Sequence, residues 1–99
     1  MSDTSTTTAV QSADEKHKAK VAEWERAMTV LKKAEEMQSV TAVRIADSVA
    51  DGVIVRNDLV DTYQVYRAQR EESFRAWRAS DEARRAAWAE LVAAEEVSG

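Results

Sequence analysis

The feature that most constrains this chain is the scarcity of residues that interrupt a helix. The 99 residues contain no proline, and the only two glycines are Gly52 and Gly99. Proline and glycine are the residues that a helix interior tolerates least. Gly52 is therefore the one strong break inside the chain, and the sequence on either side of it is free to form long helices.

The break lies in an unusual stretch, SVADGVIVRNDLV, in which three β-branched residues, 53–55, follow Gly52 directly. A buried strand, an exposed contact surface and the corner of a helical hairpin would each fit such a run. A strand here has no partner strand elsewhere in the sequence. We therefore expect a corner, in which Gly52 ends the first helix and Asn57 or Asp58 caps the second.

The first twelve residues, MSDTSTTTAVQS, are rich in Ser and Thr, which predicts a disordered tail over 1–12. Ser12 and Glu15 have the spacing of an N-cap and its N3 partner. The sequence thus predicts a hairpin over 13–97, with a helix at 13–51, a turn at 52–57 and a helix at 58–96.

Apolar and aromatic residues recur in alternating steps of three and four along both predicted helices, which is typical of coiled coils. The first seam comprises His17, Val21, Trp24, Met28, Leu31, Glu35, Gln38, Ala42, Ile45 and Val49. The second comprises Leu59, Tyr63, Tyr66, Arg70, Phe74, Trp77, Asp81, Arg84, Trp88 and Leu91. The predicted fold class is therefore all-α: an antiparallel, coiled-coil-like two-helix hairpin.

If the chain folds back at the turn, the two seams face each other. Residues 53–55 would then cap the end of the seam beside Val49 and Leu59. Further along, Gln38 would face Arg70, and the guanidinium of Arg84 would stack on the indole of Trp24.

A lone helix pair has one shared seam to bury, and further apolar residues lie off it. Two occupants could cover them: a second copy, giving a homodimeric four-helix bundle, or a different protein. Aromatic residues are enriched in interface hot spots, but the heptad positions of Trp24, Trp77 and Trp88 already explain these three as core. The candidate self-association or partner residues are Trp24, Val30, Met37, Val40, Ile54, Tyr63, Tyr66, Trp77 and Trp88.

Few residues offer chemistry. The chain has no Cys, which removes thiolate metal sites and cysteine nucleophiles, and no Gly-rich loop that could cradle a phosphate. His17 has Asp14 three residues before it, which amounts to half a metal site at most. We expect no catalytic residue, no metal and no cofactor, and therefore no enzyme.

The formal net charge of −4 disfavours general nucleic-acid binding. A row of arginines follows the second predicted helix, but acidic residues interleave with it at three- and four-residue spacings, which predicts ion pairs on a solvated face. Nucleic-acid regulation is thus the third of three functional hypotheses. The first is an adaptor, regulator or host-modulating factor that binds another protein, and the second is a structural or assembly component.

In length and central turn the chain resembles the small secreted two-helix hairpins that carry a Trp-x-Gly turn, yet Ala50 stands where their tryptophan would be. Their Tyr-x-x-x-Asp/Glu motif is also missing, because Arg67 and Arg70 follow the two tyrosines at that spacing. No family is assigned. The Ala/Arg/Val/Glu bias is similar in style to small phage proteins, and the lack of an apolar leader leads us to expect the cytoplasm of the producing or infected cell.

Overall fold

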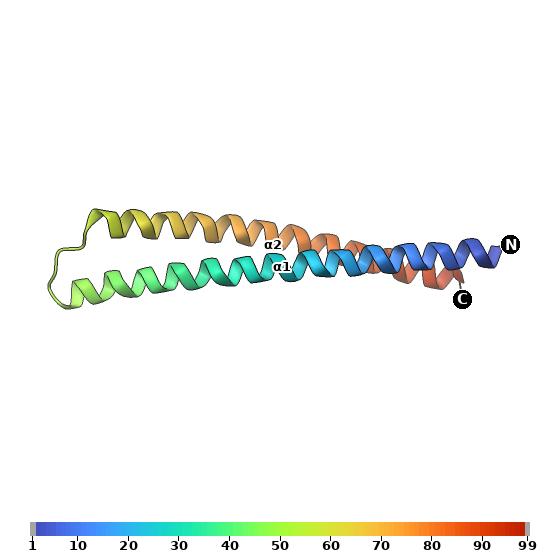
Figure 1. Ribbon diagram of the computed structural model, residues 1–99, viewed down its shortest axis with the longest axis horizontal. Helices are drawn as coiled ribbons and strands as arrows, with labels where there is room; N and C mark the ends of the chain where they lie inside the picture. Colours follow the sequence, from blue (N-terminus) through green and yellow to red (C-terminus); the bar gives the residue numbers. More distant parts are fainter. Residues whose placement is uncertain (1, 99) are drawn as a thin grey trace. The chain divides into compact units, whose positions relative to one another are not determined.

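The computed structural model describes the backbone of residues 2–98 and the side chains of residues 8–97. This part of the chain forms two α-helices, α1 (Ser2–Ala50) and α2 (Asn57–Ser98), with residues 51–56 between them and no strand. The helices run antiparallel (Figure 1). The predicted all-α helical hairpin is confirmed.

The start of α1 differs from the prediction. The helix begins at Ser2 rather than at residue 13, so residues 2–12 continue it where composition predicted a disordered tail, and Ser12 is an interior residue rather than the N-cap. The segment contains no proline or glycine. Once a helix is nucleated, each added residue gains a backbone hydrogen bond, which extends α1 through residues of modest helix propensity. Met1 lies outside the described residues.

The break at Gly52 is confirmed. Gly52 has a φ of 73°, in the left-handed region that favours glycine. Its N–H donates to the carbonyl of Val49 at 3.1 Å, and the N–H of Val53 donates to the carbonyl of Ser48 at 2.9 Å. These two bonds make a Schellman motif, which satisfies carbonyls that the end of a helix would otherwise leave open.

The start of α2 lies one residue before the predicted one. The carbonyl of Arg56 accepts bonds from the N–H groups of Leu59 and Val60, so Asn57 is the first helical residue and not the cap. Asp58 lies in the first turn, where the helix dipole favours an acid, and its carboxylate pairs with Arg56 at 3.2 Å. Of the two predicted caps, Asp58 does bond to the first turn, because its Oδ1 accepts from the N–H of Leu59 at 3.0 Å, while its other carboxylate oxygen holds the ion pair with Arg56.

The chain divides into two compact units. We call Met28–Ala76 the turn unit, and Met1–Ala27 with Trp77–Gly99 the terminal unit. Each contains a stretch of α1 and a stretch of α2 in antiparallel pairing, and each is described separately below.

In the turn unit, the buried face of α1 differs from the predicted seam. Ala34 and Thr41 are buried, whereas the predicted seam residues Glu35 and Ala42 are exposed. Both choices are compatible with heptad spacing. The observed one keeps the Glu35 carboxylate in water, and the buried Thr41 hydroxyl donates to the carbonyl of Met37 at 2.9 Å, so it carries no unpaired polar atom.

The seam of α2 is corrected in the same way. In the terminal unit Ala87 is only 1% exposed, whereas its neighbour Trp88, predicted to be in the seam, is 53% exposed. In the turn unit Ser73 is half-buried, and the predicted Phe74 and Arg70 are exposed. In both places a small side chain occupies the space between the helices and the adjacent aromatic one lies at its edge.

The core that results is small. Among the described residues, the buried hydrophobic side chains are Leu31 and Ala34 in the turn unit and Ala87 and Leu91 in the terminal unit. No large side chain among the described residues is fully buried, so little apolar surface is removed from water in either unit.

Candidate functional site

The terminal unit is held by polar and aromatic contacts between its helices. The guanidinium carbon of Arg84 lies 4.8 Å from the centroid of the Trp24 ring, which confirms the predicted stacking. Trp24 Nε1 and Arg84 Nε are buried and have no hydrogen-bond partner among the described residues. The cation–π attraction therefore has to offset the burial of these two nitrogen atoms. Such an attraction contributes about 0.5 kcal/mol where the pair is exposed and about 2 kcal/mol where it is removed from water.

Asp81 anchors the same guanidinium. Its Oδ1 accepts from Arg84 Nη2 at 2.7 Å, and its Oδ2 lies 3.0 Å from Arg85 Nε. The hydrogen bond from Arg84 lowers the pKa of Asp81 below its usual value, and the charges of both arginines act in the same direction against the opposing effect of burial. The carboxylate thus stays ionised and holds Arg84 over Trp24.

A second interhelical contact of the terminal unit joins Lys16 Nζ and Glu90 Oε2 at 2.9 Å. Next to it, the ring centroids of His17 and Trp88 lie 5.2 Å apart with an interplanar angle of 53°, so His17 packs against Trp88. Both contacts are charged or aromatic and partly exposed, which makes this end of the pairing polar in character.

Asp14 and His17, whose spacing amounts to half a metal site at most, each contact another side chain. The Asp14 carboxylate pairs with Lys18 at 2.9 Å, and its hydrogen bond and charge raise the pKa of Lys18. Within the described residues, no group of three or more His, Cys, Asp or Glu side chains is placed to hold a metal ion.

Four of the six arginines of α2 form ion pairs at the three- and four-residue spacings expected. Arg67 pairs with Glu71 and Arg78 with Glu82, each at i,i+4, and Asp81 takes both Arg84 and Arg85. Such exposed pairs contribute little stability individually. They neutralise much of the positive row that a phosphate backbone would need.

The turn unit has a different chemistry. Its interhelical hydrogen bond is Gln38 Nε2 to Tyr63 Oη at 3.3 Å, so Gln38 contacts Tyr63 where Arg70 was expected. Ile45 and Leu59 are half-buried, while Val49 is exposed. Pairing in this unit thus includes modest apolar contacts and a neutral hydrogen bond.

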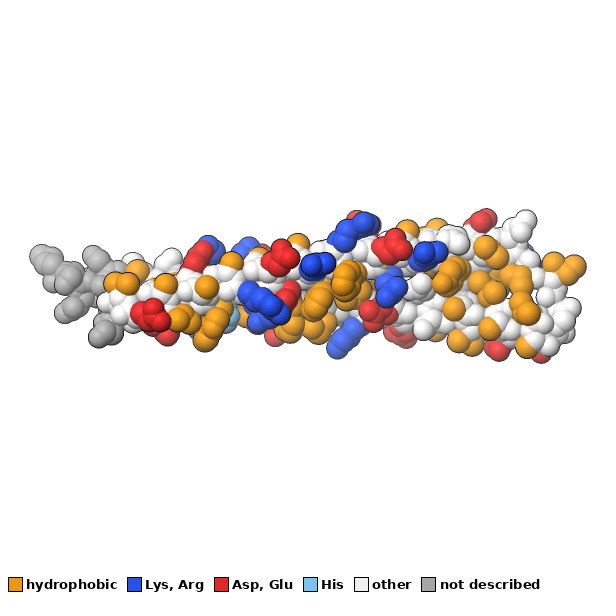
Figure 2. Space-filling model, turned by 180° about the vertical axis from the view of Figure 1, so that it is seen from behind, with side chains coloured by type: hydrophobic (Ala, Val, Ile, Leu, Met, Phe, Trp, Pro, Cys, Tyr) orange, Lys and Arg blue, Asp and Glu red, His pale blue; other side chains and the backbone are white. Residues whose placement is uncertain are grey.

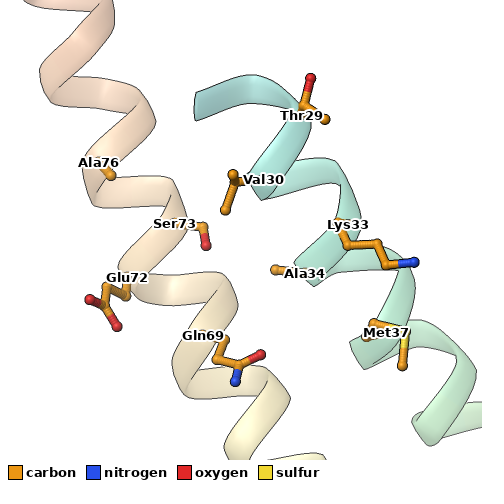
Figure 3. A pocket seen from close by; sticks show the side chains of 9 residues that line it. All are labelled: Thr29, Val30, Lys33, Ala34, Met37, Gln69, Glu72, Ser73 and Ala76. Carbon is orange, nitrogen blue, oxygen red and sulfur yellow. The ribbon is translucent and has the colours of Figure 1, made fainter. Parts of the chain in front are cut away.

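A groove of about 650 Å³ runs between α1 and α2 in the turn unit. Figure 3 shows Val30, Ala34 and Ser73 directed into the space between the helices, and Lys33 and Glu72 directed outward on opposite sides. Nine residues line the groove: Thr29, Val30, Lys33, Ala34, Met37, Gln69, Glu72, Ser73 and Ala76. Its floor consists of small side chains, which allow another helix to approach closely.

Exposed apolar side chains are concentrated in this unit. Ile54 is 89% exposed at the turn, and Val53 and Val49 are also exposed, so most of the run at 53–55 does not cap the seam as predicted. The exposed large hydrophobic residues of the turn unit are Val30, Val40, Val43, Val49, Val53, Ile54, Val60, Val65 and Phe74, against Trp88 and Val97 in the terminal unit. Figure 2 shows hydrophobic side chains gathered near the turn, with few charged ones among them.

The structure brings together only part of the candidate set predicted from sequence. Val30 and Met37 line the groove, and Val40 is exposed on the same helix. The remaining candidates do not join them: Tyr63 and Tyr66 are half-buried in the turn unit, Trp24 and Trp77 are half-buried in the terminal unit, Trp88 is half-exposed there, and Ile54 lies in the turn.

The sequence reasoning missed the α2 side of the groove. Gln69, Ser73 and Ala76 recur at steps of four and three, which places them on one helical face. That spacing was a usable signal. It is a weak signal, because these residues are small or neutral and carry none of the aromatic or large apolar side chains that mark an interface in a sequence.

No helix in the described part of the chain combines the length and the hydrophobicity needed to cross a membrane. No protein-family model, curated protein or solved structure matches the chain. The surface of the described residues is therefore the feature that indicates a function.

Proposed function

We propose that this chain is a non-enzymatic protein that works by binding other proteins, as an adaptor, regulator or host-modulating factor. One observation carries the proposal: the concentration of exposed large apolar side chains in the turn unit. In monomeric proteins large apolar patches are rare, and they commonly mark interaction sites.

The exposed apolar residues of the turn unit form more than one surface. The groove of the turn unit and the turn itself are two separate apolar surfaces, centred on Val30 and on Ile54.

The turn is the surface we assign to a foreign partner. Ile54 is the most exposed large hydrophobic residue, and a non-helical segment between two helices presents it. Large apolar side chains that bury fully against a partner are the ones that dominate binding energy. The charged residues nearest to Ile54 along the chain are Asp51 and Arg56, so the centre of this surface is apolar and its edge is polar.

Ile54→Asp tests the proposal. Because Ile54 is already in water, the change should alter the free energy of unfolding by less than about 0.5 kcal/mol. We expect the parent to retain a specific protein from a cell lysate and the variant to lose it, as measured by affinity capture with mass spectrometry.

Val97→Asp is the matched control, because Val97 is 81% exposed in the terminal unit and receives the same substitution. It should retain the captured protein. Capture that is lost equally in both variants, or that is absent from the parent, would count against a protein-binding role for the turn.

A further inference from the structure

We propose that the groove of the turn unit is filled by a second copy of this chain, in a two-fold dimer whose turns lie at the same end. In this arrangement α1 of each copy packs on α2 of the other, forming a four-helix bundle around the two grooves. The inference rests on the proposed protein-binding role and specifies one partner and its orientation.

The charges beside the groove favour a dimer whose turns lie at the same end. Lys33 and Glu72 line opposite sides of the groove, one on each helix, and neither forms an ion pair among the described residues. A two-fold axis parallel to the helices places α1 opposite the partner's α2. Each lysine then lies beside the partner copy's glutamate, and the contact occurs twice in the dimer.

A dimer with its turns at opposite ends would not bring these opposite charges together. A two-fold axis perpendicular to the helices places the turns at opposite ends and packs α1 against its own copy. The two lysines of the dimer would then lie on one side and the two glutamates on the other. Like charges brought together across an interface oppose association.

The sizes of the side chains at the groove favour the same orientation. Val30 is 58% exposed and projects from α1, while Ser73 and Ala76 of α2 are small. With turns at the same end, Val30 of one copy meets the small residues of the other, so that a large side chain fits a small space. With turns at opposite ends, the large α1 residues Val30 and Met37 would face each other.

A charge-exchange series tests the pairing. The dimer dissociation constant would be measured by sedimentation equilibrium for the parent, Lys33→Glu, Glu72→Lys and the double variant. We expect each single change to weaken the dimer about tenfold, since it creates two like-charged contacts, and the double variant to recover parental affinity. Arg78→Glu, an exposed charge reversal in the terminal unit, is the control and should leave the constant unchanged.

Spin labels test the orientation. The chain has no Cys, so Ile54→Cys places a single label on each copy. With turns at the same end, the two labels should lie within about 30 Å of each other, which is three helix diameters. With turns at opposite ends and the axis at the groove, about 21 helical residues separate each label from the axis, which gives roughly 60 Å.

The outcomes separate the two proposals. A chain that stays monomeric at every concentration, or labels near 60 Å with charge exchanges that have no effect, would overturn this dimer. Either result leaves capture of a foreign protein at Ile54 as an independent measurement of the proposed function. Short label distances together with rescue by the double exchange would support the dimer whether or not a foreign protein is captured.

Discussion

Gly52 shows how one residue determines the topology of the chain. Its φ of 73° allows the two Schellman hydrogen bonds that end α1, and a Cβ atom built on it would meet nothing within 4 Å. The demand for glycine here is therefore conformational and not steric. Sequence alone identified this position because glycine is otherwise absent from the interior of the chain.

Gly52→Ala should lower the free energy of unfolding by about 1 kcal/mol, since an L-residue pays that cost in the left-handed region. Gly52→Asn should lose less, because asparagine tolerates this conformation better. Urea unfolding at one fixed protein concentration would measure both. An alanine variant as stable as the parent would mean that the turn does not hold this conformation in solution.

Asp81 is the residue whose environment the sequence described only partly. Spacing predicted its ion pairs, but not that the same carboxylate would hold the guanidinium that stacks on Trp24. The contact needs residues from both helices in one register, and spacing along a single helix contains no such information.

The lowered pKa of Asp81 gives a pH dependence with a defined sign. A carboxylate whose pKa is lower in the folded state stabilises the fold above its ordinary value of 3.8, and this contribution disappears as the pH falls through the lowered value. Asp81→Asn should therefore be less stable than the parent at neutral pH, and the difference should shrink in strong acid. Thermal unfolding from pH 7 to pH 2 would measure it.

The matched control for Asp81 is Glu36→Gln, which neutralises an exposed acid without an ion pair among the described residues. It should follow the parent at neutral pH. A parent–variant difference for Asp81→Asn that stays constant down to pH 2 would contradict the role assigned to its ion pairs.

At the scale of the elements, heptad spacing predicted the helices and their antiparallel pairing but chose the wrong residues for part of the seam. Trp88 was assigned to the core because it is large and apolar, yet Ala87 occupies that place. A heptad pattern accepts either neighbour. What decides between them is the room between the helices, which depends on both faces together and not on the hydrophobicity of one residue.

A pair of substitutions at adjacent residues tests this register. Ala87→Leu should overpack the space between the helices of the terminal unit and lower the free energy of unfolding by about 1–3 kcal/mol. Ala86→Leu, the same change at an exposed position, should stay within about 0.5 kcal/mol of the parent. Circular dichroism during urea unfolding measures both.

Equal losses from the two leucine substitutions would contradict the observed register. A larger loss from Ala86→Leu than from Ala87→Leu would favour a seam displaced toward the other side of α2.

At the scale of the whole molecule, the two units differ in the contacts that join their helices and in the apolar surface that they expose. The terminal unit joins its helices with the stacked Trp24 and Arg84 and the Lys16–Glu90 ion pair, while the turn unit exposes most of the large apolar side chains. The sequence predicted the surplus of apolar residues. It could not place the groove, because the groove arises where small residues of two helices meet.

The pairing also implies an order of events during folding. Lys16 and Glu90 are separated by 74 residues in the chain, whereas Gln38 and Tyr63 are separated by 25. Closing the longer loop first would cost about 1 kcal/mol more in chain entropy, so folding should spread outward from the turn. The groove between the helices should therefore form before the ends of the chain find each other.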